Sequence, residues 1–198
     1  ELFVMLVAPF LGMPLPLLPL QILWMNLVTD GLPGLALGFE PPEQDAMRRP
    51  PHPPNESVFA RGLGTHVLWA GPLMGLIALT TGFVFWSAGD ELWQTMLFTV
   101  LTLGQMFHVM AIRLERESLF TRGPFGNPYL FWAVMLTIAL QGALLYVPFL
   151  QDLFQLKPLD YRHILSAFGL ASVIFWVIEV QKLVLRRRDR SSGGDAAT

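Results

Sequence analysis

Three side chains that carry oxygen atoms interrupt an apolar run near the beginning of this sequence. Asn26, Thr29 and Asp30 lie within residues 20–34, a stretch otherwise composed almost entirely of apolar residues. Spacings of three and four residues place side chains on one face of a helix, so we predict that these three share a face. A carboxylate in the middle of a membrane costs about 3 kcal/mol or more, and therefore Asp30 needs a partner or a function.

Residues that weaken a helix follow Asp30 directly. Gly31, Pro33 and Gly34 come next, and proline removes a backbone donor whereas glycine lowers helix stability. We therefore expect the helix to unwind near Asp30 and to free carbonyl oxygens. Side-chain oxygens beside unwound backbone are typical of cation sites in membrane transporters. The alternative is a polar contact between packed helices, with a proline kink.

The composition of the chain indicates a membrane protein. Of its 198 residues, 53% are hydrophobic and only 14% are charged, compared with about 25% charged residues in soluble domains. The absence of cysteine excludes disulfides and thiolate metal sites. Apart from one short basic tail, nothing favours a nucleic-acid partner. The chain begins at Glu1, in an apolar stretch without the features of a signal peptide, and we interpret this beginning as a cut through a longer chain.

Hydropathy predicts an all-α, polytopic bundle of membrane helices, with one partial helix and five complete ones. The partial helix covers residues 1–12, and the complete spans cover about 17–39, 60–87, 92–112, 128–150 and 163–185. A proline-rich loop, 40–56, and a charged connection, 113–127, join them on one side. We assign residues 1–185 to a membrane domain and 186–198 to a basic, then polar, disordered cytoplasmic tail.

The basic residues support this arrangement of spans. If each span crosses once, eleven of the thirteen basic residues fall on one side, and only Lys157 and Arg162 fall on the other. The positive-inside rule then predicts a cytoplasmic C-terminus.

Other polar residues also interrupt the predicted spans. Gln105 lies midway along its span, and His108 follows on the same side. A lone histidine in a helix is more often a packing residue than a ligand, and an amide can join helices by hydrogen bonds. We interpret Gln141 and Glu179 as structural, and we expect Glu179 to pair with Lys182, three residues on.

Motifs of catalysis are absent from the sequence. It contains no glycine-rich phosphate loop, no His-Glu metal motif and no Ser-His-Asp grouping. We therefore predict no catalytic residues and no cofactor-binding residues, and this chain by itself has no visible means of using ATP.

The stretch from Leu20 to Pro33, with Asn-Leu-Val-Thr-Asp-Gly-Leu-Pro at its centre, closely resembles the sixth membrane helix of P-type cation-transporting ATPases. The calcium-pump branch is the nearest. The resemblance continues through 36–42, 45–51, 113–120 and 156–159, and so it covers nearly the whole chain. It implies that the chain is the C-terminal transport half: the end of helix five, followed by helices six to ten.

The resemblance also implies a set of ion ligands. Asn26, Thr29 and Asp30 match the family's ligands on helix six, and Glu1 falls where the helix-five glutamate stands. Gln105 falls where the reticulum calcium pump has a glutamate on helix eight. This substitution removes one negative charge, as in plasma-membrane-type calcium pumps, which carry one ion per cycle. The helix-four glutamate of the family lies outside this chain.

The function implied is that of the ion-binding membrane half of an ATP-driven pump, with calcium export across the plasma membrane as the expected activity. Ca²⁺ would be the cargo, and Mg-ATP would act only through the phosphorylation and nucleotide domains, which this segment lacks. The partners would be the lipid bilayer and the N-terminal half of the same pump. Two alternatives remain open: a sodium or proton pump on the same scaffold, and a stand-alone membrane module without ATPase activity.

Overall fold

The computed structural model describes residues 1–40, 63–113 and 126–194, and the described residues contain helices and no strand. The predicted all-α membrane bundle is therefore confirmed. The helical elements, with their bounds, are α1 (Leu2–Val7), η1 (Ala8–Leu11), α2 (Pro19–Trp24), η2 (Met25–Asp30), α3 (Gly31–Leu37), α4 (Leu63–Ser87), α5 (Trp93–Ile112), α7 (Pro128–Tyr146), α8 (Pro148–Phe154) and α9 (Tyr161–Gly194). The proline-rich loop and most of the charged connection lie outside the described residues.

Among the described residues, four helices are long and apolar enough to cross a membrane, whereas the sequence predicted five. These four helices are α4, α5, α7 and α9. α7 is shorter than predicted because Val147, which precedes Pro148, has extended backbone angles, as residues before proline prefer. α9 is longer than predicted and continues to Gly194, so residues 186–194 are helical where the sequence predicted a disordered tail.

The remaining predicted span is divided among α2, η2 and α3. These segments have 6, 6 and 7 residues, and together they rise about 28 Å, close to the roughly 30 Å thickness of a bilayer core. The backbone at Asp30, with φ −97° and ψ −42°, is helical. The predicted unwinding near Asp30 is thus wrong, and residues Met25–Asp30 form a π-helix instead.

Pro33 explains why this helix widens without unwinding. A proline ring crowds the carbonyl group four residues earlier and cannot donate a hydrogen bond to it. Here that carbonyl belongs to Thr29, which lies in the π-helical segment. A wider π turn separates the two groups while the backbone remains helical, and such turns occur frequently at functional sites.

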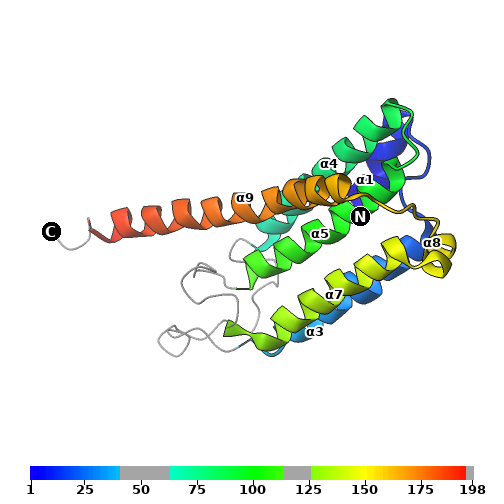
Figure 1. Ribbon diagram of the computed structural model, residues 1–198. Coiled ribbons are helices and arrows are strands. Elements are labelled where there is room, and N and C mark those ends of the chain that lie inside the picture. Colours follow the sequence, from blue (N-terminus) through cyan, green and yellow to red (C-terminus); the bar gives the residue numbers. More distant parts are fainter. Residues whose placement is uncertain (41–62, 114–125, 195–198) are drawn as a thin grey trace.

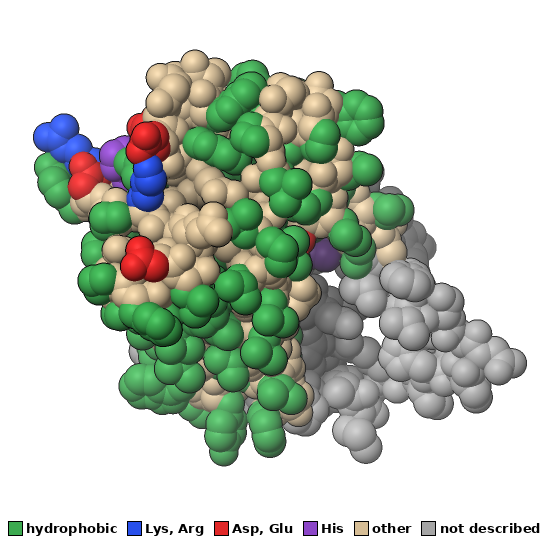
Figure 2. All heavy atoms as spheres, turned by 90° about the vertical axis from the view of Figure 1, so that its right-hand side faces the viewer, with side chains coloured by type: hydrophobic (Ala, Val, Ile, Leu, Met, Phe, Trp, Pro, Cys, Tyr) green, Lys and Arg blue, Asp and Glu red, His purple; other side chains and the backbone are tan. Residues whose placement is uncertain are grey.

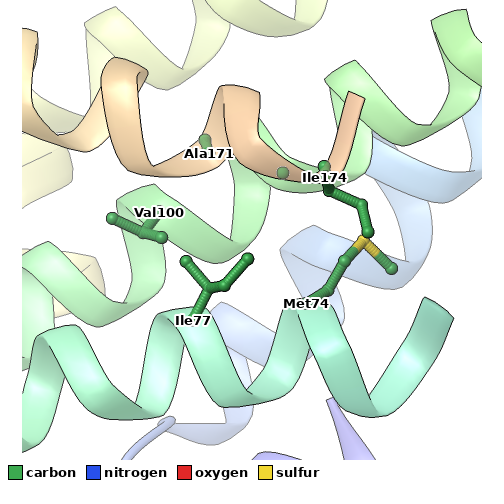
Figure 3. A pocket seen from close by; sticks show the side chains of 6 residues that line it. Met74, Ile77, Val100, Ala171 and Ile174 are labelled. Carbon is green, nitrogen blue, oxygen red and sulfur yellow. The ribbon is translucent and has the colours of Figure 1, made fainter. Parts of the chain in front are cut away.

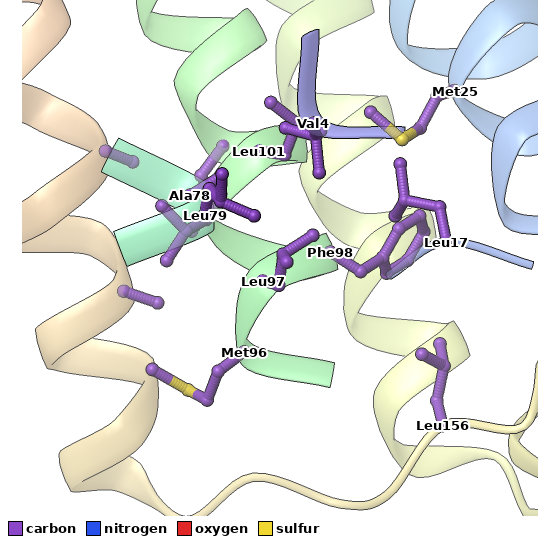
Figure 4. Close-up of a cluster of buried hydrophobic side chains, with 14 of the residues drawn as sticks. Val4, Leu17, Met25, Ala78, Leu79, Met96, Leu97, Phe98, Leu101 and Leu156 are labelled. Atoms are coloured by element: carbon purple, nitrogen blue, oxygen red, sulfur yellow. The ribbon is translucent and has the colours of Figure 1, made fainter. Parts of the chain in front are cut away.

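α5 is the central helix of the bundle (Figure 1). It packs against α4 and α9 on one side and against η2 and α7 on the other, while α3 lies along α7. Most of its residues are buried. Figure 4 shows how the main core forms around it: Leu97 and Leu101 of α5 belong to one buried cluster with Ala78 of α4, Val4 of α1 and Met25 of η2.

Glycines set how closely α4, α5 and α9 pack. A Cβ atom at Gly82 of α4 would lie 2.6 Å from Leu97 Cδ1, so the absent side chain permits this contact with α5. Gly104 of α5 differs, because a Cβ atom there would have no neighbour within 4 Å. It borders a small apolar cavity between the three helices, which Figure 3 shows with Met74 and Ala171 among its lining residues.

The outer surface of the bundle is apolar. Leu27, Leu68, Trp132 and Trp176 are more than half exposed, as are many other large hydrophobic side chains. Figure 2 shows such side chains covering much of one face, with the few charged side chains gathered in one part of it. Together with the membrane-length helices, this surface is that of an integral membrane protein.

Candidate cation site

A chain of hydrogen bonds joins three of the predicted site residues from three different segments. The hydroxyl of Thr29, in η2, donates to Gln105 Oε1 of α5 at 2.8 Å. Gln105 Nε2 in turn donates to Glu1 Oε1, just before α1, at 3.4 Å. Glu1 and Gln105 are partly buried and Thr29 is 2% exposed. The structure therefore brings together Glu1, Thr29 and Gln105, which are up to 104 positions apart in sequence.

The chemistry of Glu1 fixes which way the amide of Gln105 points. An ionised carboxylate only accepts hydrogen bonds, so the amide nitrogen faces Glu1 and the amide oxygen faces Thr29. The Thr29 hydroxyl also lies 2.7 Å from the carbonyl oxygen of Met25. When its hydrogen points to Met25, lone pairs of Thr29 Oγ1 and Gln105 Oε1 are both available.

The separation of these two oxygens suits a calcium shell. Calcium binds oxygen at 2.3–2.6 Å, often in a pentagonal bipyramid, and neighbouring oxygens in its five-membered girdle are then about 2.8 Å apart. Thr29 Oγ1 and Gln105 Oε1 have this separation. The pair is therefore spaced as two ligands of one hard cation would be.

Asn26 and Asp30 differ from Thr29 in burial. Both are exposed, whereas Thr29 is buried. The wider π turn changes the angle between successive side chains and rotates Thr29 inwards. Asn26 donates to the carbonyl of Ile22 at 3.0 Å, while the charge of Asp30 interacts with that of Glu1.

The described residues provide an incomplete shell for a metal ion. They contain no group of three or more His, Cys, Asp or Glu residues placed to hold one. What they provide is two interacting carboxylates, those of Glu1 and Asp30, together with the neutral oxygens of Thr29 and Gln105. Such a set suits a hard cation only when further ligands complete it.

Sequence reasoning missed a cluster that closes one end of the bundle. Glu40, after α3, accepts from the Arg113 guanidinium at 3.1 Å and from Asn127 Nδ2 at 2.7 Å. Asn127 also caps α7, accepting from the backbone N–H of Leu130 at 3.0 Å. The only signal in the sequence is the position of each residue at the end of an apolar run, which does not reveal that the three ends meet.

A pair of histidines lies between α4 and α5. His66 Nε2 and His108 Nε2 are 3.1 Å apart, and their rings are stacked with centroids at 5.4 Å. One nitrogen must donate and the other accept, so His108 is a hydrogen-bonded packing residue, in line with the role the sequence predicts for it. The predicted pair of Glu179 and Lys182 is confirmed, with charged atoms 3.6 Å apart.

Comparison with known proteins places these observations in a family context. The family model described as cation transporting ATPase, C-terminus, matches residues 14–184. A calcium-transporting ATPase of Bacillus subtilis is 42% identical over 176 residues, which cover 87% of this chain and 20% of that protein. Calcium-transporting ATPase 1 of Yarrowia lipolytica is 34% identical over 193 residues, covering 96% and 21%. Calcium-transporting ATPase type 2C member 2 of Mus musculus is 33% identical over 178 residues, covering 87% and 18%. The chain thus spans about a fifth of the length of these curated relatives.

Proposed function

Since this chain belongs to the cation-transporting ATPases, as a C-terminal membrane region, we propose that it carries half of the ion site of an ATP-driven calcium pump. Glu1, Asn26, Thr29, Asp30 and Gln105 are the proposed ligands. The observation that carries the proposal is the hydrogen-bonded chain from Thr29 through Gln105 to Glu1, with Asp30 close enough to Glu1 for their charges to interact. The printed names of the relatives support calcium as the cargo.

The electrostatics of the site support a divalent ion. Glu1 and Asp30 repel each other when both are ionised, and a cation of charge two between them would neutralise both. Thr29 and Gln105 would add two neutral oxygens, and Asn26 a third. Calcium takes six to eight oxygen ligands, so the N-terminal half of the pump would supply the others to the exposed face of η2.

Gln105 favours one calcium ion per cycle. An amide at this position adds an oxygen but no negative charge, so this half of the site holds two carboxylates, enough for one divalent ion. Calcium bound per phosphoenzyme, measured by isotope on the intact pump, is expected to be one, with a Hill coefficient near one. Two ions per phosphoenzyme would contradict this stoichiometry.

The test of the function uses the full-length pump in membranes. Asp30→Asn should weaken activation by calcium of phosphorylation from ATP by at least about 100-fold, because it removes one of two charges that neutralise a partly buried cation. Asp152→Asn, the same substitution at an exposed position in α8, is the control and should leave activation unchanged. Activation like that of the wild type in Asp30→Asn would show that Asp30 is structural.

The choice of ion and the membrane orientation are tested separately. Micromolar calcium, and not sodium, should activate phosphorylation of the wild type; activation by sodium alone would favour a sodium pump on the same scaffold. We further propose that the pump exports calcium across the plasma membrane and that its C-terminus is cytoplasmic, because most basic residues fall on the C-terminal side.

A further inference from the structure

Two buried glutamines of this protein differ in whether their side-chain amides have hydrogen-bond partners. Gln21, which is fully buried, accepts from the backbone N–H of Leu18 at 3.1 Å and donates to the carbonyl of Phe154 at 3.0 Å. Gln141 of α7 is only 2% exposed, yet neither its Oε1 nor its Nε2 has a hydrogen-bond partner among the described residues. An amide buried without partners is strongly unfavourable, so this group needs a partner that the described residues do not provide.

Threonine hydroxyls on α5 and α7 lack partners as well. Thr102 of α5 and Thr137 of α7 are fully buried, and within the described part of the chain their Oγ1 atoms make no hydrogen bond. A threonine inside a helix usually donates to the carbonyl four residues earlier. Thr81 does so here, at 2.8 Å, and the Thr29 hydroxyl lies 2.7 Å from the corresponding carbonyl oxygen. Thr102 and Thr137 do not, and neither does Thr99, which lies one turn before Thr102 on α5.

The flanking apolar clusters place these three residues at a similar level along α5 and α7, as a polar layer. On one side of the layer, Met106 and Val109 pack with Leu130 and Val134. On the other side, Phe98 and Leu101 belong to the same core cluster as Leu144 and Leu145. The two helices thus run antiparallel between two apolar clusters. Spacings of three and four residues keep Thr102, Thr137 and Gln141 on the same faces as these apolar neighbours.

The polar layer adjoins the candidate cation site. Thr102 lies three residues before Gln105 on α5, and it therefore sits about one turn away on the same helical face. Gln105 is the residue that joins Thr29 to Glu1. A ligand bound between Thr102 and Gln141 would consequently lie next to the proposed calcium ligands.

We propose that Thr102, Thr137 and Gln141 form a binding site for internal water between α5 and α7. A buried water typically makes two to four hydrogen bonds to polar groups that have no other partner, and this layer offers two hydroxyls and one amide. The layer contains no charged side chain, so a bound cation would keep an uncompensated charge in an apolar interior. Water is the ligand whose charge and hydrogen-bonding capacity match the layer.

The site has a consequence for transport, which rests on the proposed function. Calcium commonly keeps water among its six to eight ligands. Water held one turn from Gln105 can complete the ligand shell of the ion, and the same site can take up water that the ion loses. Neither a density map nor a thermal midpoint measures transport. Activation of the wild-type pump by calcium, measured in parallel, therefore distinguishes failure of the proposed function from failure of the water site.

The direct test is a density map of the full-length pump, in lipid, at a resolution near 2 Å. We expect a water peak within hydrogen-bond distance of Gln141 Oε1 or Nε2, bridging to Thr102 or Thr137. An empty layer would overturn the proposal, and so would a direct hydrogen bond from the Gln141 amide to another protein group.

A pair of isosteric variants gives a second, independent readout. Gln21→Met should lower the thermal midpoint of the pump, because it leaves the backbone groups of Leu18 and Phe154 without a partner. Gln141→Met should leave the midpoint within about 1 °C of the wild type, because methionine displaces water and breaks no bond between protein groups. A clear rise in Gln141→Met would indicate a dry, unpaired amide, and a fall like that of Gln21→Met would indicate a protein partner. Either outcome would overturn the proposal.

Discussion

Replacing Gln105 by glutamate tests whether Gln105 and Glu1 share the ion site. The amide nitrogen donates to Glu1 Oε1 at 3.4 Å, and a carboxylate in its place has no hydrogen to donate unless it is protonated. Two unit charges at this distance repel by about 5 kcal/mol at an effective dielectric constant of about 20. At 1.36 kcal/mol per tenfold change, this repulsion lowers the population in which both carboxylates are ionised by a factor of more than about 10³.

The expected result in Gln105→Glu is a proton retained between the two carboxylates when no cation is bound. Such a pair titrates as a unit, and a bound cation must displace the proton. Calcium binding should therefore release about one more proton than in the wild type. Below neutral pH, the apparent calcium affinity of Gln105→Glu should therefore lose about one further factor of ten per pH unit compared with the wild type. The assay is calcium-activated phosphorylation of the full-length pump at pH 6, 7 and 8.

The matched control is Gln94→Glu, which makes the same change near the beginning of α5, where the amide donates to the carbonyl of Leu15 at 3.1 Å. Among the described residues it has no carboxylate partner of this kind, and it should keep the pH dependence of the wild type. If Gln105→Glu and the wild type show the same slope of affinity against pH, then Gln105 and Glu1 do not share the ion site.

Three further predictions concern stability and orientation. Gly104→Ala should stabilise the pump by up to about 1 kcal/mol, through helix propensity, because its Cβ atom meets open space. Gly82→Ala should destabilise the pump, because its Cβ atom would lie 2.6 Å from a leucine of α5. Equal thermal midpoints for the two variants would contradict the packing described. Glu40→Gln should lower the thermal midpoint, since it removes a negative charge that faces a buried guanidinium, and an unchanged midpoint would show that this cluster contributes little. Cysteines introduced at Asp90 and Ser191 should differ in labelling from outside intact cells, only the first being accessible, and equal labelling would refute the proposed orientation.

Most of the fold could be predicted from local sequence. Long apolar runs bounded by prolines, glycines and charges predicted α4, α5 and α7 to within a few residues at most ends, because a membrane span must satisfy its own backbone hydrogen bonds as a helix. The exception at Val147 has a local cause, since the proline that follows ends α7 early. The error at Asp30 came from treating Pro33 as a helix breaker when a wider turn accommodates it.

The candidate site was only partly predictable. The residue types indicated a cation site, and the family resemblance pointed to Glu1 and Gln105 as members of it. No pattern in the sequence shows that Thr29 and Gln105, 76 positions apart, are hydrogen-bonded, or that Glu40 accepts from Arg113, 73 positions away. Such contacts depend on how helices pack and rotate, which hydropathy does not encode.

The sequence by itself determined that this chain is a bundle of membrane helices with carboxylate, amide and hydroxyl oxygens inside one span, because hydrophobicity and helical spacing are local properties. Only the tertiary structure decided which of those oxygens meet. The π turn directs Thr29 inwards and leaves Asn26 and Asp30 on the exposed face, and the packing of α5 brings Gln105 between Thr29 and Glu1. The physical reason is that the direction of a side chain depends on the geometry of the turn that carries it, and a contact depends on the neighbouring helix that receives it.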